Sequence, residues 1–375
     1  MNQGFYLTIM MGSFNASPVP QAVIEALTSV QVTTSVGAQG GFQMKFTFGK
    51  TGAFAQLQAS GFFDPRRRVI IAVTVNGATE VLMDGIITKQ DLTPSGAAGK
   101  STFTVTGLDL TALMDFIDLT GIPYPALPAF VVVELILAKY AVLGVVPVAL
   151  PTLMSLIHNP LEKIPKQEGT DYAYITKLGA DVGALFYLDP GPAPGQSLAY
   201  WGPDITKMFG GTQRALSIDL DASSNVDSLN FAYDGTLAKD YMITILEPNS
   251  KIPIPIPLPS LDALRAPQAA HAPTALKFEQ LKPIANKKPV EAALAALGAL
   301  FSSAEVVTAT GQLDVLRYGH VLKARKLCAV RGASEYYDGQ YYVKSVTHDI
   351  KRGEYKQSFS LARGGTGSSV ATVPV

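Results

Sequence analysis

The sequence predicts a mainly β protein with an α+β insertion, built from two antiparallel β modules of which the second is split. Apolar and polar residues alternate with a period of two up to about residue 115 and again after residue 304, as in half-buried strands. Helical spacing of apolar residues replaces this pattern between about 116 and 203. Prolines at every second position from 253 to 259 then interrupt the later alternation, because each removes a backbone donor.

The first module is expected over residues 1–115. Four apolar residues share one face of its first clear strand: Phe42, Met44, Phe46 and Phe48. A second strand carries Val69, Ile71, Val73 and Val75. Asn76-Gly77 predicts a hairpin after it, because both central positions of a type I′ turn need a positive φ. The return strand runs through Val81 towards Ile86, and we expect Asp84-Gly85 to interrupt it. A further strand begins near Phe103.

Residues 116–203 are predicted to form the α+β insertion. Helical spacing already begins just before it, at Leu110, Leu113, Met114 and Ile117. Thr170 is a predicted helix cap, and Gly183 suits a left-handed stop. Between them one apolar stripe consists of Tyr174, Ile175, Leu178 and Val182. A strand is expected over 184–188, followed by a Pro- and Gly-rich loop.

The second module is predicted in two parts, 204–246 and 304–363. The first part alternates through Leu216, Ile218 and Leu220, and the second ends with a turn at Arg352-Gly353. Its last strand places four residues on one face: Tyr355, Gln357, Phe359 and Leu361. Residues 247–303 between the parts are predicted to hold an extended polyproline-type crossover and an Ala-rich helix near 291–300. Residues 364–375 are predicted to be a loose tail.

The composition is poor in charge. Only 16% of the residues are charged and 47% are hydrophobic, whereas roughly 25% charged residues are usual. Such a surface is usually covered by a membrane, an oligomer or an obligate assembly. The zero net charge argues against a protein built around nucleic-acid phosphates, and the single Cys excludes an internal disulfide or a Cys-based zinc site.

Residues 129–150 are the best candidate for a membrane span. They contain 13 residues from Val, Leu, Ile and Phe, but also Glu134, Lys139 and Pro147. At about −0.3 to −0.6 kcal/mol for each apolar residue and about +2.5 to +3.5 for each central charge, gain and cost are of similar size. We therefore expect a buried helix followed by a Val-rich strand. The first basic residue is Lys45, so no secretion leader is expected and the protein should be made in the cytosol.

No catalytic, cofactor-binding or metal site is predicted. Residues 95–101 resemble a phosphate loop, but Pro94 stands where the first Gly is needed and a strand follows, so a hairpin loop is expected. The four histidines are not paired at i and i+4: His158, His271, His320 and His348. Cys328 lies in an apolar strand, where a small buried hydrophobe is expected.

Three charged groups are left open by the pattern. Asp219 and Asp221 are expected on one strand face, where they are either solvated or a carboxylate pair for hydrolysis. Five basic residues without an acid either line a channel, dock an acidic partner or form an ordinary solvated face: Arg317, Lys323, Arg325, Lys326 and Arg331. Residues 66–68, all Arg, are expected to guard an edge strand against stray pairing.

Several stretches together resemble the late control D family of phage tail hub proteins. They cover residues 164–172, 178–187, 200–203, 309–319, 337–348 and 353–359. Characteristic pieces are Tyr200-Trp201-Gly202-Pro203 and Tyr337-Asp338-Gly339. The resemblance extends over most of the chain and is weak over 120–160 and 247–300.

The resemblance implies a structural baseplate hub of a contractile injection machine, in a phage tail or a phage-derived particle assembled in the bacterial cytoplasm. Each subunit would contribute two tube-forming β modules, so that a homotrimer adapts the hexameric inner tube to the trimeric spike. The implied partners are further copies of the chain, the inner tube or its initiator protein, the spike and other baseplate proteins. Only a short tail follows Phe359, so the spike is expected to be a separate protein. No cofactor, stable membrane insertion or sequence-specific nucleic acid is implied.

Two alternatives belong to other classes. One is a particle-associated cell-wall hydrolase that uses acids such as Asp219 and Asp221. The other is a membrane-embedded module that uses residues 129–150. The non-enzymatic hub is the leading prediction, because it accounts for both the strand-rich pattern and the missing charge.

Overall fold

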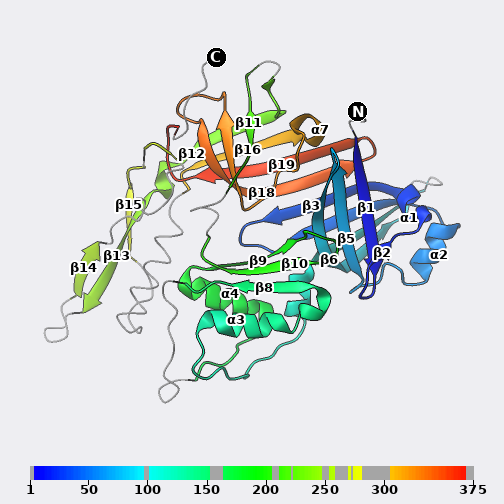
Figure 1. Cartoon of the computed structure of the whole chain (residues 1–375), viewed down its shortest axis with the longest axis horizontal. Helices are drawn as coiled ribbons and strands as arrows, with labels where there is room; N and C mark the ends of the chain where they lie inside the picture. Colours follow the sequence, from blue (N-terminus) through cyan, green and yellow to red (C-terminus); the bar gives the residue numbers. More distant parts are fainter. Residues whose placement is uncertain are drawn as a thin grey trace.

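The computed structural model describes residues 4–96, 101–152, 164–204, 211–220, 223–246, 253–257, 269–271, 273–280 and 305–368. Most strands join one large sheet, and an α+β layer lies beside it (Figure 1). The prediction of a mainly β chain with an inserted α+β layer is therefore confirmed.

The large sheet has 13 strands in the order β12-β16-β19-β18-β3-β4-β7-β6-β5-β1-β2, with β17 beside β18 and β11 beside β17. Its early strands are β1 (Phe5–Gly12), β2 (Ser17–Pro18), β3 (Leu27–Ser35), β4 (Gly41–Phe48), β5 (Arg68–Val75), β6 (Ala78–Thr93) and β7 (Ser101–Asp109). Its late strands are β11 (Thr212–Ser217), β12 (Ser228–Tyr233), β16 (Val307–Asp314), β17 (Leu327–Arg331), β18 (Gly339–Lys351) and β19 (Glu354–Arg363). All pairings in this sheet are antiparallel except β11 with β17.

Strands from the two halves of the chain are hydrogen-bonded to each other. β18 runs antiparallel to β3, with Ile350 opposite Val30 and Val346 opposite Thr34. One hydrophobic core contains residues of both halves, for example Val32 and Val343. The strands of the two predicted modules thus form one open sheet, and no closed tube is present among the described residues. The predicted domain boundaries stay predictions.

The alternation in the sequence is confirmed in the early strands. Phe42, Met44 and Phe46 of β4 are buried, and Asn76 and Gly77 turn the β5–β6 hairpin with φ of 51° and 84°. The predicted break at Asp84-Gly85 is wrong, since β6 is continuous over 16 residues. Gly85 allows β7 to approach closely, because a Cβ there would lie 2.1 Å from the Leu108 carbonyl oxygen.

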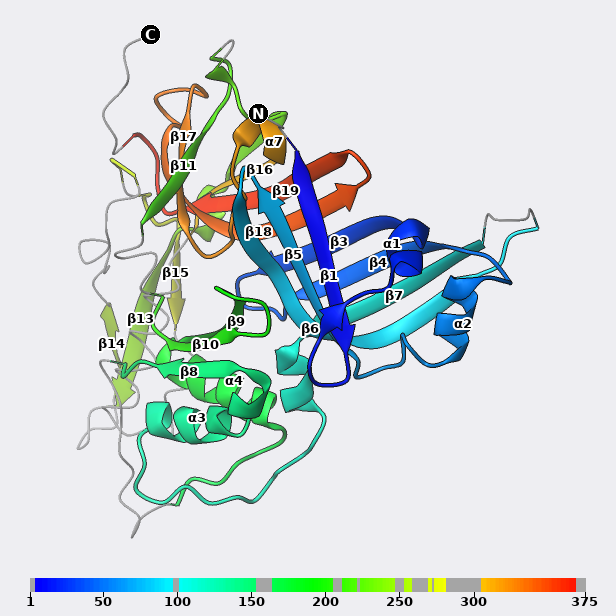
Figure 2. The ribbon, with the colours of Figure 1, turned by 45° about the vertical axis from the view of Figure 1, so that its right-hand side comes forward.

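Short helices lie in the segments that connect strands of the large sheet. They are α1 (Gln21–Ala26), α2 (Ala53–Ala59), α7 (Val315–Tyr318) and the 3-10 turn η4 (Gly235–Leu237). The predicted turn at Arg352-Gly353 joins β18 and β19, and the predicted face of β19 is buried from Tyr355 to Leu361. The sheet is strongly curved (Figures 1 and 2), and a side chain of β1 packs against one of β19, with the rings of Phe5 and Tyr355 5.4 Å apart.

The inserted layer has its own core. It begins with the 3-10 helix η1 (Leu110–Asp115), continues through α3 (Ala129–Ala138), η2 (Ala141–Leu143) and α4 (Asp171–Val182), and includes β8 (Val145–Ala149), β9 (Leu185–Pro190) and β10 (Ser197–Gly202). The strand order is β8-β10-β9. Thr170 caps α4 by accepting from the Ala173 amide, and Gly183 ends it in the left-handed conformation, as predicted. Trp201 is fully buried and donates to the Ile175 carbonyl.

A third, small sheet has the order β14-β13-β15, formed by β13 (Lys239–Leu246), β14 (Pro253–Pro257) and β15 (Lys277–Gln280). Here the predicted polyproline-type crossover is wrong over 253–257, where the chain forms an edge strand. An edge strand needs only every second N–H, so alternating prolines are tolerated. The predicted Ala-rich helix at 291–300 lies outside the described residues. The start of the predicted loose tail is bound, since Thr366 and His271 exchange backbone hydrogen bonds.

Candidate functional site at the junction of the sheet and the inserted layer

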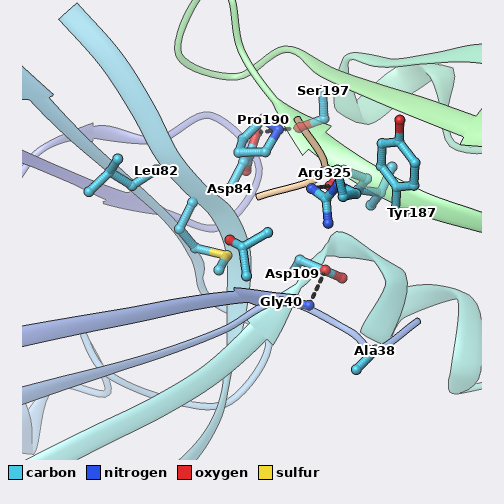
Figure 3. A pocket seen from close by; sticks show the side chains of 12 residues that line it. Ala38, Gly40, Leu82, Asp84, Asp109, Tyr187, Pro190, Ser197 and Arg325 are labelled. Atoms are coloured by element: carbon cyan, nitrogen blue, oxygen red, sulfur yellow. Dashed lines mark hydrogen bonds between the residues drawn. The ribbon is translucent and has the colours of Figure 1, made fainter. Parts of the chain in front are cut away.

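A small cavity lies where the large sheet meets the inserted layer (Figure 3). Its volume is about 20 Å³, and its walls come from β6, β9, β10 and the segment before β17. This space holds about one water molecule, whereas ligand sites in proteins usually measure hundreds of Å³. The cavity is therefore too small for a substrate, and the interest of the junction lies in the charged side chains that line it.

Arg325 joins three parts of the chain at this cavity. Its guanidinium donates to the carbonyl oxygens of Ser35 and Leu188 at 3.2 and 3.3 Å, and to Asp189 Oδ1 at 3.3 Å. It also lies 4.2 Å from the ring centre of Tyr187, in a cation–π contact. Only 6% of Arg325 is exposed. A residue of the second half thus binds the inserted layer to the end of β3.

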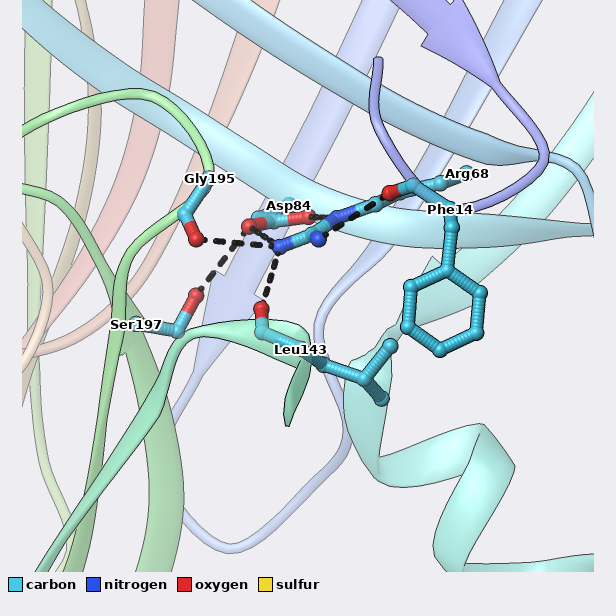
Figure 4. A network of polar contacts seen from close by, with 6 residues as sticks. All are labelled: Phe14, Arg68, Asp84, Leu143, Gly195 and Ser197. Atoms are coloured by element: carbon cyan, nitrogen blue, oxygen red, sulfur yellow. Dashed lines mark hydrogen bonds and ion pairs between the residues drawn. The ribbon is translucent and has the colours of Figure 1, made fainter. Parts of the chain in front are cut away.

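Arg68 makes a second connection at the junction (Figure 4). It binds Asp84 on the neighbouring strand in a bidentate ion pair, with Nε–Oδ1 at 2.8 Å and Nη2–Oδ2 at 2.6 Å. The same Nη2 donates to the carbonyl oxygens of Leu143 and Gly195 in the inserted layer. Ser197 Oγ donates to Asp84 Oδ2 at 3.4 Å. Both members of the ion pair are buried. The inserted layer is therefore attached to the sheet through a charged group that is already neutralised by its partner.

The prediction that residues 66–68 guard an edge strand is wrong for Arg68. β5 lies inside the sheet between β6 and β1, and only a buried acid makes the Arg68 charge tolerable there. Arg66 has φ of 71° and covers the ring of Phe116 at 5.4 Å. Arg67 donates to Ser13 Oγ at 2.8 Å.

Asp109 completes the polar lining of the cavity. Its carboxylate accepts from the Gly40 amide at 2.6 Å and from the Thr111 amide at 2.9 Å. Burial raises the pKa of Asp109, although these hydrogen bonds act in the opposite direction. The contacts fix the start of η1 against the turn before β4. Asp109 therefore orders the backbone at the junction.

Of the two acids that were either solvated or a carboxylate pair for hydrolysis, the structure describes Asp219. β11 ends at Ser217, and Asp219 lies beyond it in a bend with φ of 52°. Asp221 lies outside the described residues. The expected strand position is wrong for Asp219, because β11 ends before it.

Of the remaining titratable candidates, His348 and Cys328 are buried in the core. His348 is buried on β18, and its Nδ1 lies 2.7 Å from the Tyr355 hydroxyl. Burial lowers the pKa of His348 to about 3, so the ring is neutral at pH 7. Cys328 is fully buried, as predicted, and burial raises the pKa of its thiol to about 12. His158 lies outside the described residues. Within those residues no group of three or more His, Cys, Asp and Glu side chains is placed to hold a metal ion.

The basic cluster of 317–331 is dispersed by the fold. Arg317 pairs with Asp227, Lys323 pairs with Glu80 at 2.5 Å, and Arg325 is buried at the junction. Lys326 and Arg331 are exposed. These five residues therefore do not act as one channel lining or acid-binding face, because three of them serve contacts within the chain.

Two segments that resembled functional motifs are ordinary structure. Thr93 of β6 pairs with Thr102 of β7, so these strands form a hairpin, as expected; residues 95 and 96 follow β6, Ser101 begins β7, and 97–100 lie outside the described residues. Residues 129–150 form a buried helix and a strand, as predicted. No helix in the described part of the chain is long and apolar enough to cross a membrane.

No protein-family model matches the chain, and no curated protein matches its sequence. Solved structures do match its fold. A tail protein from Neisseria meningitidis is 13% identical, with a TM-score of 0.59 over 96% of this chain and 97% of that one. The 43 kDa tail protein of prophage MuSo2 from Shewanella oneidensis is 13% identical, with a TM-score of 0.61 over 96% and 98%.

A third match comes from the E. coli c3393 protein, which is described as a component of the type VI secretion system with structural similarity to the T4 bacteriophage tail proteins gp27 and gp5. It is 14% identical, with a TM-score of 0.52 over 93% of this chain and 77% of that one. The chain therefore has the fold of phage tail proteins along nearly its whole length.

Proposed function

We propose that this chain is the structural baseplate hub of a contractile injection machine, and that it acts as a homotrimer between a hexameric inner tube and a trimeric spike. The observation that carries the proposal is the fold match, which spans 96% of this chain and at least 97% of two phage tail proteins. A match over the full length of both chains favours a shared architecture over a shared single domain.

The surface supports burial in an assembly. Large apolar side chains are exposed in the described residues at Tyr6, Phe14, Phe116, Ile117, Leu276 and Phe278. With only 16% charged residues, the chain has few charged side chains to separate them. Subunit contacts in a ring would remove such side chains from water, and a ring of three copies matches a trimeric spike by symmetry.

The polar interior supports a structural role. The buried charges at the junction are paired or hydrogen-bonded within the chain, as in Arg68 with Asp84 and Arg325 with Asp189. The proposed hub belongs to the late control D family, works without a cofactor and is assembled in the bacterial cytoplasm. Its partners are the inner tube or its initiator, the spike and other baseplate proteins.

Multi-angle light scattering on the purified chain tests the proposal. We expect three copies in the complex, and an even copy number or a monomer at every concentration contradicts the homotrimer. Incubation with peptidoglycan tests the enzyme alternative in parallel. Cell-wall turnover that is lost in Asp219→Asn, with the fold retained by circular dichroism, contradicts the structural role.

A further inference from the structure

A surface groove separates the start of β1 from the β18–β19 turn. Its volume is about 370 Å³, and apolar side chains from both halves of the chain form its walls. They include Phe5, Leu7, Leu27, Leu316 and Ile350. This volume is within the range of protein sites that accept a small ligand or a few side chains.

The rim of this groove is basic. Lys351 and Arg352 line it, and none of the described residues that line it is acidic. The ion pair of Lys351 with Glu354 is long, at 3.8 Å, and the Lys351 side chain is 60% exposed. Arg352 Nη2 donates to the Glu25 backbone oxygen at 2.6 Å, an acceptor without a formal charge. The groove therefore suits a segment that carries apolar side chains next to carboxylates.

The chain itself exposes such a segment. Asp115-Phe116-Ile117-Asp118 lies at the end of η1, and all four residues are exposed. Phe116 is 47% exposed and Ile117 is 64% exposed, which is unusual for two neighbouring large apolar residues. We name residues 115–118 the acidic knob.

Contacts within the subunit hold the acidic knob in place. Asp115 Oδ1 accepts from Thr170 Oγ1 at 2.5 Å, and Asp118 Oδ1 accepts from the Thr120 amide at 2.8 Å. The Thr120 hydrogen bonds hold the pKa of Asp118 below its usual range, so that carboxylate is ionised at pH 7. A loop that is already ordered loses little conformational entropy when it binds.

We infer that the acidic knob of one copy inserts into the groove of a second copy, with Ile117 in the apolar part and Asp115 and Asp118 facing Lys351 and Arg352. In Figure 2 the start of β1 and α7 lie at the top of the view, and the inserted layer that contains η1 lies at the bottom. Two different surfaces of the subunit therefore meet, and a head-to-tail contact of this kind forms a ring of three when successive copies are rotated by one third of a turn, or an open filament when the rotation does not close. The inference rests on the proposed homotrimer, for which it supplies a subunit contact.

A cysteine crosslink tests this contact directly. Cys328 is fully buried, so introduced cysteines are the reactive ones. One full-length chain carries Ile117→Cys, and a second, differently tagged chain carries Thr28→Cys, at an exposed residue that lines the groove. Mixing the two under mild oxidation is expected to give a disulfide-linked pair. Val142→Cys, at a position that is 74% exposed in η2, replaces Ile117→Cys as the control and should give no pair.

Light scattering on substituted chains supplies the energetic test. Ile117→Asp should raise the dissociation constant of the oligomer about 10- to 100-fold, because one apolar side chain loses its burial. Val142→Asp should leave it unchanged. Asp118→Arg and Arg352→Glu should each weaken the oligomer, and the chain carrying both should recover, since the charges are exchanged across the contact.

The outcomes separate this contact from the hub. A trimer that survives Ile117→Asp and gives no crosslink overturns the groove contact and leaves the hub standing. A specific crosslink in a closed dimer supports the contact and contradicts the homotrimer. A chain that stays monomeric and gives no crosslink overturns both the groove contact and the homotrimer. The groove would then bind a segment of another protein.

Discussion

At the scale of single residues, we expect substitutions of the buried charged residues to have the largest effect on the free energy of unfolding. Arg68 satisfies Asp84 and also two carbonyl oxygens of the inserted layer. The sequence signal for this contact is a lone Asp inside an apolar strand, a pattern that by itself predicts an interruption. A buried acid needs a partner, but sequence does not say which cation the sheet register brings opposite to it.

Arg68→Ala is expected to lower the free energy of unfolding by about 3–5 kcal/mol, because the Asp84 carboxylate is then left buried without its cation. Urea unfolding followed by circular dichroism measures the change. Arg67→Ala is the matched control, and it should change the free energy of unfolding by less than about 0.5 kcal/mol. Equal effects from both variants would contradict the role assigned to Arg68.

His348 predicts a pH dependence with a defined sign. Burial lowers the pKa of His348 to about 3 in the folded chain, whereas an unfolded His has a pKa near 6.5. Between these two pKa values, the His348 ring is therefore protonated in the unfolded chain and neutral in the folded chain. Stability from this residue is present above pH 6.5 and is lost as the pH falls towards 3, by up to about 1.4 kcal/mol per pH unit.

Unfolding free energies of the wild type and His348→Gln at pH 7, 6, 5 and 4 test this expectation. Gln keeps a polar group near the Tyr355 hydroxyl and does not titrate. The difference between the two proteins should shrink as the pH falls, because only the wild type loses the His contribution. Parallel pH profiles would show that folding does not lower the pKa of His348.

At the scale of elements, the start of α4 joins local and long-range contacts. Thr170 Oγ1 accepts from the Ala173 amide at 3.2 Å and donates to Asp115. The cap is predictable from the residue type and the apolar stripe that follows it. The bond to Asp115 is not, because it links positions 55 residues apart.

Thr170→Ala is expected to destabilise the chain by about 1 kcal/mol, because the amide at the helix start loses its acceptor. Thermal or urea unfolding measures the loss. Thr170→Ser keeps the oxygen and should recover most of it. A Ser variant as unstable as the Ala variant would mean that the methyl group, and not the cap, is what matters.

At the scale of the whole molecule, the pairing of β3 with β18 makes the two halves one cooperative unit. Val32 of β3 and Val343 of β18 belong to the same core, while the inserted layer has a separate one. A cavity made in the large core is therefore expected to loosen strands from both ends of the chain.

Val32→Ala should cost about 2 kcal/mol and speed amide hydrogen exchange about 30-fold in β3 and β18 alike. Exchange followed by mass spectrometry on the full chain measures both strands at once. Val133→Ala, in the core of the inserted layer, is the control and should act on α3 and β8. Faster exchange confined to β3 would contradict one cooperative sheet.

Local sequence determined several of the elements of this chain. Period-two alternation predicted the buried faces of β4 and β19, Asn76-Gly77 the hairpin, and Thr170 with Gly183 the limits of α4. These features depend on backbone preferences and on which side chains avoid water within a few residues. The low content of charge is likewise a property of the sequence alone, and it favours a surface that is covered in an assembly.

Only the tertiary structure decided which distant segments meet. The β3–β18 pairing, the Arg68–Asp84 ion pair and the position of Arg325 all join residues whose separation in the chain carries no local signal. Strand alternation specifies the face that is buried but not the neighbouring strand, since any antiparallel partner satisfies the same backbone groups. The neighbour is chosen by the packing of the whole core, and packing exists only once the chain has folded.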